Sequence, residues 1–383
     1  MPFDAFYNFI RRKLLRASPM RCPYCCEILR DETAKAASFH CVRQQSAARL
    51  DEIRYAHPEG PSVGETGWVD LSSFPVNKSY LTDARRGRIR FVSVLGLKTA
   101  GKTTWLQSLG ASTLYPHVGK NHCYGMVPCS LMNAAGAEGD PALLDSQALG
   151  LGELPASTDL RGRPPTYMLA AGPGRLRHFV LKDIAGEALM QGFAELLRAP
   201  DKRHLITSTW HLFIINASNP DQMSASLAHA VHWIDEVHCS LLATQANQPG
   251  RPGRPPRALV MFAQCDSPRC PARLVEAVNL RPNRIHLDDG PPPTVRDYME
   301  GMAKADRLAR AELKERAPKL FDLLVDTRNF ASLRVGACSA LGSAPVAFAA
   351  GEDSPYLAAC ATQPALVRVV DPILWMLRDE KLI

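Results

Sequence analysis

The sequence predicts an α/β protein: a sheet of about six mostly parallel strands with flanking helices. Three observations favour this fold class. Short apolar runs alternate with helix-like runs from residue 88 onward. A glycine-rich turn follows one apolar run and opens a helix-like run. The chain of 383 residues is 46% hydrophobic and 22% charged, which is typical of a globular protein.

Each element follows from its local pattern of apolar residues and turn signals. We expect strands at 89–95, 167–171, 177–183, 210–216, 258–264 and 333–338. We expect helices at 102–110, 187–198, 222–241, 295–325 and 371–381.

The chain divides into two predicted parts. Residues 1–87 form a small N-terminal module with a helix, a cysteine-bearing segment and a linker, and residues 88–383 form the α/β domain. Stretches near 111–165 and 268–330 are long for simple connections, so we interpret both as insertions.

Composition narrows the classes of protein. Eleven cysteines in 383 residues are too few for a disulfide scaffold and favour a reducing cytoplasmic location. A net charge of +7 is too weak to indicate nucleic-acid binding. No apolar run is long enough for a transmembrane segment. The amphipathic stretch 1–18 either docks on its own protein or contacts a membrane surface.

The stretch "GLKTAGKTTW" (96–105) fits the phosphate-loop pattern GxxxxGK[ST]. Gly96 and Gly101 let backbone N–H groups surround a phosphate chain, Lys102 reaches the β- and γ-phosphates, and the Thr103 hydroxyl ligates Mg²⁺. The N-terminus of the following helix adds its dipole to anion binding. We assign Ala100 and Thr104 to the same nucleotide-binding loop.

A second motif follows in "HFVLKDIAGE" (178–187), where an apolar strand ends at Asp183 and Gly186 completes DxxG. Such an aspartate can hold Mg²⁺, and the glycine N–H can bind a γ-phosphate. The alternative is that Asp183 is a helix N-cap.

A third and a fourth motif come later in the chain. "ALVMFAQCD" (258–266) is a strand that ends near Asp266, and "LRVGACSALG" (333–342) is a strand followed by Ser339 and Ala340. The order of the four motifs resembles the Ras-like P-loop GTPases over about 88–383. The resemblance implies that Asp266 reads guanine, that Ser339 and Ala340 support the base, and that the cofactors are GTP and Mg²⁺.

More narrowly, the chain resembles bacterial double-GTPase-type proteins of conflict and defence systems, which pair a cysteine-bearing ribbon with a GTPase domain. The run "DPILWML" (371–377) fits their closing helix. This resemblance implies a protein effector or activating partner that the sequence does not name.

The chain departs from the family pattern at two places. Gln264 stands where the family has lysine, which weakens the case for strict guanine preference, and Glu187 follows DxxG where a water-orienting glutamine is common. For the first switch we prefer Thr166 over Thr158, and the third alternative is that neither threonine is the switch residue. Arg163, three residues before Thr166, is either a transition-state arginine or a solvated loop residue.

The N-terminal cysteines suggest a zinc site. Cys22 and Cys25 form a CxxC turn, and Cys41 adds a third candidate ligand. His40, His57 or Cys26 would supply the fourth. Because no second CxxC is present, a degenerate ribbon without Zn²⁺ is the alternative.

Four functions follow, in order of preference. The first is a GTP-hydrolysing switch with Lys102, Glu187 and Arg163 as catalytic residues. The second is a nucleotide-binding scaffold that barely hydrolyses, the third an ATP-using ATPase or kinase, and the fourth a zinc-ribbon nucleic-acid binder.

Overall fold

A computed structural model describes the backbone of residues 39–41, 46–48, 53–56, 68–69, 89–97, 100–114, 125–131, 153–155, 166–172, 175–184, 202–240, 242, 255–280, 295–340, 356–359 and 367–381. It describes side chains within 89–97, 100–106, 108–109, 179–184, 204–240, 242, 255–280, 299–340 and 367–381.

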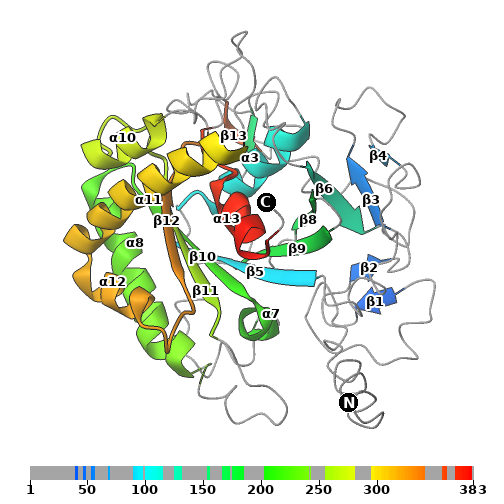
Figure 1. The fold of residues 1–383 in the computed structure, drawn as a ribbon, viewed down its shortest axis with the longest axis horizontal. Helices are drawn as coiled ribbons and strands as arrows, with labels where there is room; N and C mark the ends of the chain where they lie inside the picture. The colour runs from blue at the N-terminus through cyan, green and yellow to red at the C-terminus, as the bar shows by residue number, and fades with distance from the viewer. Residues whose placement is uncertain are drawn as a thin grey trace, which may run out of the picture.

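The centre of the described fold is a parallel sheet in the strand order β12-β11-β10-β5-β9 (Figure 1). Its strands are β5 (Ile89–Leu95), β9 (Arg175–Asp183), β10 (Trp210–Asn216), β11 (Arg257–Ala263) and β12 (Leu333–Ala337). All five lie at or within two residues of the predicted ranges, and the α/β prediction is confirmed.

The sheet continues beyond β9 with antiparallel strands. These are β8 (Thr166–Gly172), β6 (Gly125–Leu131), β3 (Ile53–Ala56) and β4 (Trp68–Val69). β8 was predicted, but the other three were not, so the sheet is larger than the six strands expected. Pro128 within β6 is one reason, because proline in an apolar run argues against a strand.

Two small sheets lie outside the main one among the described residues. β1 (Phe39–Cys41) pairs with β2 (Ser46–Ala48), and β7 (Glu153–Pro155) pairs with β13 (Tyr356–Ala359). The division of the chain at residue 87 stays a prediction.

The parallel strands are buried on both faces. In β10, Trp210, Leu212 and Ile214 belong to one hydrophobic cluster, while Phe213 and Ile215 belong to the other. This alternation follows from the two-residue period of a strand, and burial on both sides explains the continuous apolar runs in the sequence.

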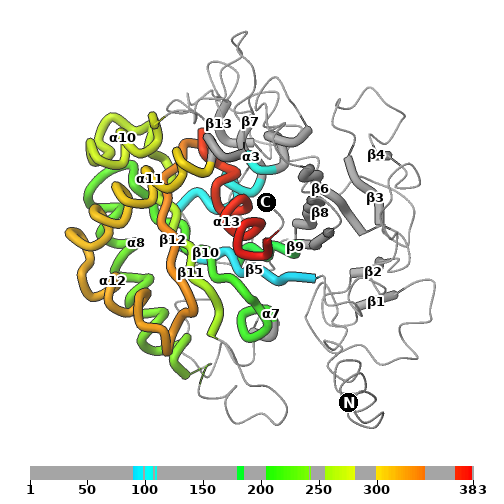
Figure 2. The backbone as a smooth tube through the Cα atoms, viewed as in Figure 1, coloured from blue at the N-terminus to red at the C-terminus, as the bar shows by residue number. Residues whose placement is uncertain are grey.

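One face of the sheet is covered by α3 (Lys102–Leu114) and α13 (Asp371–Asp379). Trp105 of α3 is fully buried there, and its Nε1 donates a hydrogen bond of 2.9 Å to the Val369 carbonyl just before α13. The C-terminal helix thus packs beside α3, the helix that follows the phosphate loop (Figure 2).

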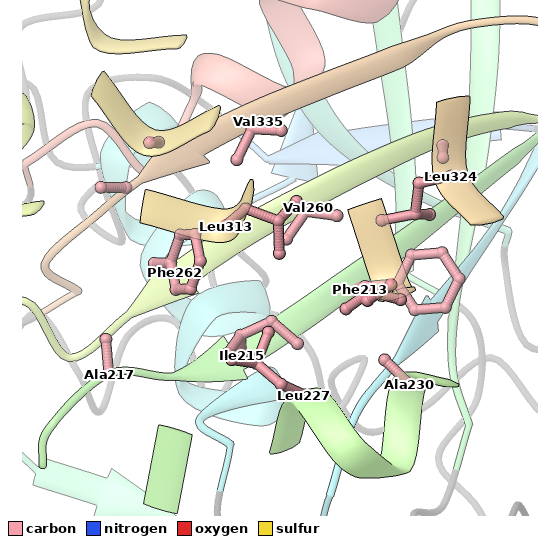
Figure 3. Close-up of a cluster of buried hydrophobic side chains, with 14 of the residues drawn as sticks. Phe213, Ile215, Ala217, Leu227, Ala230, Val260, Phe262, Leu313, Leu324 and Val335 are labelled. Carbon is pink, nitrogen blue, oxygen red and sulfur yellow. The ribbon is translucent and has the colours of Figure 1, made fainter. Parts of the chain in front are cut away.

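The other face is covered by α8 (Pro220–His232), the π-helical turn η3 (Trp233–His238), α10 (Ala272–Asn279), α12 (Pro318–Val325) and most of α11 (Val295–Arg316). Their side chains meet those of the strands in the second cluster, where Leu227, Leu313 and Leu324 surround Phe213 and Val260 (Figure 3). The short helix α7 (Lys202–Thr207) precedes β10 and contributes Leu205 to this cluster.

Several helix boundaries differ from the prediction. The predicted helix 222–241 begins earlier, at Pro220, because the Asn219 side chain caps it by accepting from the Gln222 N–H at 2.9 Å. The single helix expected over 295–325 was wrong: the chain forms α11 and α12, since Pro318 disfavours helical conformation at Ala317. α10 was not predicted, and the helix expected at 187–198 lies outside the described residues.

Within the described part of the chain, no helix is both long enough and apolar enough to cross a membrane.

Candidate functional site

The candidate site lies at the carboxyl ends of the parallel strands. β5 is central: the next parallel strand in the sequence, β9, lies on one side of it, and β10 lies on the other. In open α/β sheets, the point where successive strands go to opposite sides leaves a crevice that binds ligands. The residues at or just after the carboxyl ends of β5, β9, β11 and β12 include those that the sequence motifs single out.

The turn after β5 depends on its two glycines. Gly96 has φ +152°, and a Cβ added there would lie 2.5 Å from the Ile214 carbonyl oxygen of β10. Gly101 has φ +85°, a conformation that side-chain-bearing residues rarely adopt. Between them, the Ala100 N–H donates to the Leu97 carbonyl at 3.1 Å. The backbone therefore turns tightly against the neighbouring strand, as a phosphate loop requires.

Lys102 opens α3 and turns back toward the loop. Its side chain is buried, and its Nζ donates to the carbonyl oxygens of Gly96 at 2.9 Å and Leu97 at 3.0 Å. The same Nζ lies 4.0 Å from Asp183 Oδ1. The ammonium group is thus held at the mouth of the loop, where it can meet a phosphate.

Asp183 joins the loop from the end of β9. It lies beside Val94 of β5 in the parallel register, and it is buried. The Thr103 hydroxyl donates to Asp183 Oδ2 at 3.0 Å. Residues 80 positions apart in the sequence therefore meet. The N-cap alternative for Asp183 involves residues after Ile184 that lie outside the described part.

The chemistry of this group fits a magnesium–nucleotide complex. Thr103 and Asp183 offer hard oxygen donors, and Mg²⁺ in nucleotide sites takes one or two protein oxygens besides phosphate oxygens and water. The described residues contain no cluster of three or more His, Cys, Asp or Glu that could hold a metal by themselves.

The turn after β11 carries Asp266. Burial raises the pKa of its carboxyl, and hydrogen bonds from its own backbone N–H and from the Ser339 side chain partly offset that rise. The Cys265 N–H donates to the Cys338 carbonyl at 3.2 Å, which ties this turn to the end of β12. The two predicted base-reading motifs are thus in direct contact.

The backbone at Ser339 and Ala340 is held from two sides. Ser339 and Val367 exchange two backbone hydrogen bonds, of 3.0 and 2.9 Å. The Ser108 hydroxyl of α3 donates to the Ala340 carbonyl at 3.2 Å. Sequence reasoning missed Val367 and Ser108, because neither lies in a motif.

A small cavity of about 10 Å³ lies behind the phosphate loop, between β10 and α8. Gly96, Ser226 and His229 are among its lining residues, and the volume suits about one water molecule. Burial and then the Lys102 charge lower the pKa of His229 to about 4, so its imidazole is neutral at pH 7. The sequence carried no signal that would connect His229 with the loop.

Three further predicted site residues lie in described helices or strands. Thr104 follows Thr103 in α3 and is half-buried. Thr166 begins β8, where its backbone pairs with Leu181 of β9. Cys41 ends β1, and its side chain is outside the described part. The candidates that lie outside the described residues are Cys22, Cys25, Cys26, His57, Thr158, Arg163, Gly186 and Glu187.

No protein-family model matches the sequence, and no curated protein matches it. Among solved structures, the G domain of the FeoB iron transporter of T. maritima is similar at 9% identity and a TM-score of 0.24, covering 66% of this chain and 88% of that one. The signal recognition particle receptor SRb-GTP/SRX complex of Chaetomium thermophilum is similar at 13% identity and a TM-score of 0.29, covering 66% and 94%. These scores are too low to support any inference about this chain.

Proposed function

We propose that the chain binds GTP at the carboxyl end of the parallel sheet, hydrolyses it to GDP and phosphate, and acts as a nucleotide-dependent switch. The observation that carries this proposal is the convergence of four separate motifs. Lys102, Thr103 and Asp183 gather at one end of the site, and Asp266 with Ser339 gathers at the other.

The phosphate end suits a triphosphate. Backbone N–H groups of the loop and the Lys102 ammonium supply positive charge to the phosphate oxygens. Asp183 and Thr103 would hold Mg²⁺, which neutralises part of the phosphate charge when it is bound.

The base end suits guanine. An ionised Asp266 carboxylate can accept hydrogen bonds from both N1–H and the N2 amine of guanine, whereas adenine offers no such pair of donors to it. Because the carboxylate is partly buried, leaving it without these donors would cost free energy, and that cost favours the guanine ring.

Hydrolysis is an in-line attack. A water oxygen forms a bond to the γ-phosphorus while the bond from that phosphorus to the β–γ bridging oxygen breaks, and GDP leaves. Lys102 stabilises the charge that develops on the phosphate oxygens. Glu187 would face the attacking water, and because an ionised glutamate accepts but cannot donate, we infer a slow intrinsic rate.

The switch would respond to the γ-phosphate through Thr166 and Gly186. Arg163 is a candidate for stimulating hydrolysis within the same chain.

We further propose that the chain is a cytoplasmic protein of a bacterial conflict or defence system, with a protein partner and with Zn²⁺ bound at Cys22, Cys25 and Cys41. Elemental analysis of protein purified without added metal tests the zinc: one ion per chain is expected, and no zinc together with full stability of Cys22→Ser would contradict it.

The experiment for hydrolysis is single-turnover release of phosphate from GTP. The wild type is expected to release phosphate slowly, Lys102→Ala not at all, and Glu187→Gln at an equal or higher rate than the wild type. Loss of a fast basal rate in Glu187→Gln would make Glu187 the catalytic base and end the slow-switch proposal.

A scaffold that binds nucleotide without hydrolysis is the second candidate, and Glu187 in place of glutamine favours it. Tight GTP binding with no phosphate release, alone or with added cell extract, would establish it.

A further inference from the structure

Gln264 has an unusual backbone conformation for its residue type. Its φ of 61° lies in the left-handed region, which glycine adopts freely and which side-chain-bearing residues avoid. The backbone around it is firmly held. Its carbonyl accepts from the Ser267 N–H at 3.2 Å, and the preceding Ala263 carbonyl accepts from the Ala217 N–H at 2.9 Å. A glycine would fit this position with less strain, so the glutamine side chain calls for a separate explanation.

The side chain of Gln264 lies over the phosphate loop. Its Nε2 is 3.3 Å and its Cγ 3.9 Å from the position that a Cβ on Gly101 would occupy. Gly101 is the residue immediately before Lys102. The amide therefore packs on the backbone that presents the lysine, and it does so because Gly101 has no side chain.

Gln264 and Asp266, two residues of one turn, thus contact two different segments of the site. Gln264 contacts the phosphate loop through Gly101, and Asp266 contacts the base-reading turn through Ser339. The left-handed conformation at Gln264 lets the turn make both contacts within three residues.

We propose that Gln264 is a positioning residue that sets the spacing between the phosphate loop and the carboxylate of Asp266. This inference rests on the proposed nucleotide site. A residue that sets this spacing contributes to the affinity for the whole nucleotide, whereas Asp266 discriminates between bases. Removing the side chain should therefore lower the affinity for GDP and the affinity for GTP by the same factor, and it should leave the ratio of GTP to ATP affinity unchanged.

Gln264→Gly provides the sharpest variant, because it has opposite effects on stability and on binding. Glycine removes the backbone strain, so the melting temperature without nucleotide should stay equal or rise. It also removes the contact with Gly101, so the Kd for GDP and for GTP should each rise roughly tenfold. Gln264→Ala should show the same loss of affinity without the gain in stability.

Lys381→Gly is the matched control. Lys381 is an exposed residue with φ 58°, and it follows Glu380, which pairs with Arg90 at the start of β5, the opposite end of that strand from Gly96. This variant should gain stability for the same backbone reason and keep the wild-type affinity for nucleotide.

The measurements are calorimetric titrations with GDP, GTP and ATP and thermal unfolding of each variant. Unchanged GDP and GTP affinity in Gln264→Gly would overturn the inference, and so would a changed ratio of GTP to ATP affinity, since Gln264 would then read the base. A parallel fall in stability and affinity would also overturn it, by assigning Gln264 a merely structural role. If the wild type bound no nucleotide, the proposed function itself would fall as well.

Discussion

The two ends of the candidate site are built in different ways. The phosphate end comes largely from one stretch of the sequence, residues 96–103. Its shape depends on Gly96, which lies against the Ile214 carbonyl of β10, and on Gly101, which has a positive φ. The base end is assembled from the ends of two strands, and it is held by the Cys265–Cys338 backbone hydrogen bond and by the contact of Ser339 with Asp266. Sterics thus shape the first end, and polar contacts between distant segments shape the second.

This difference predicts how each end fails. Substitutions at the phosphate end should abolish binding or destabilise the fold, because the loop packs directly on β10. Substitutions at the base end should change which nucleotide binds while leaving the fold intact, because Asp266 lies at the end of a strand that is held by other residues.

Lys102→Ala tests the phosphate end and should have the largest effect. It removes the ammonium that meets the phosphates, so the affinity for GTP should fall at least about a hundredfold. The fold should survive, because the Lys102 ammonium bonds to the loop carbonyls of Gly96 and Leu97 and approaches Asp183, and it is not a packing group of the core. Titration with GTP and circular dichroism check this, and unchanged affinity would reduce the loop to a structural turn.

Gly96→Ala tests the steric half of the comparison. Its Cβ would lie 2.5 Å from the Ile214 carbonyl oxygen, which cannot move without disturbing β10, so we expect about 2–4 kcal/mol of destabilisation. Gly336→Ala is the matched control: its Cβ would meet the flexible end of Met261 at 3.0 Å, and about 1 kcal/mol is expected. Urea unfolding measures the free energy of unfolding of both variants, and an equal loss of stability in the two would argue against a rigid loop.

Asp266→Asn tests the base end. Asparagine can accept only one of the two guanine donors, so GTP affinity should fall roughly tenfold or more, while affinity for xanthosine triphosphate should rise. The thermal stability should barely change. Asp322→Asn, at an exposed position on α12, is the control. Equal loss of GTP and xanthosine triphosphate binding would show that Asp266 supports the turn rather than reading the base.

Acid should weaken the fold, because several buried histidines are neutral in the folded chain. Burial and then the Lys182 charge lower the pKa of His204 to about 3, and the pKa values of His229 and His238 are lowered to about 4, chiefly by burial. His204 bonds Ser93 of β5 at 3.2 Å, and His229 lies behind Gly96.

The sign of this effect follows from proton binding. Between about pH 6.5 and pH 4 the unfolded chain binds protons that the folded chain does not, so stability falls as the pH falls, by up to about 1.4 kcal/mol per pH unit for each histidine. Urea unfolding across this range checks it. His204→Asn should reduce the slope, and a flat profile would contradict neutral buried histidines.

The same difference between the two ends explains how much the sequence could predict. The glycine pattern at 96–101 and its lysine lie within a few residues of each other, so the sequence alone indicates their chemistry. All strands of the parallel sheet were predicted, because burial on both faces leaves continuous apolar runs.

What the sequence could not show depends on contacts between distant segments. Neither Ser108 nor Val367 belongs to a motif, yet both hold the backbone around Ala340. The departure at Gln264 was visible as a residue type, but its contact with Gly101 requires the backbone conformation of both residues. The break at Pro318 could have been predicted from the restriction that proline places on its preceding residue.

The most direct test of a guanine-nucleotide site is competition against fluorescently labelled GDP with unlabelled GTP and ATP. Because Asp266 lies partly buried beside Ser339, GTP should compete at a concentration at least about tenfold lower than ATP. Equal competition by GTP and ATP would contradict the guanine assignment, and no binding of the labelled nucleotide would contradict the site itself.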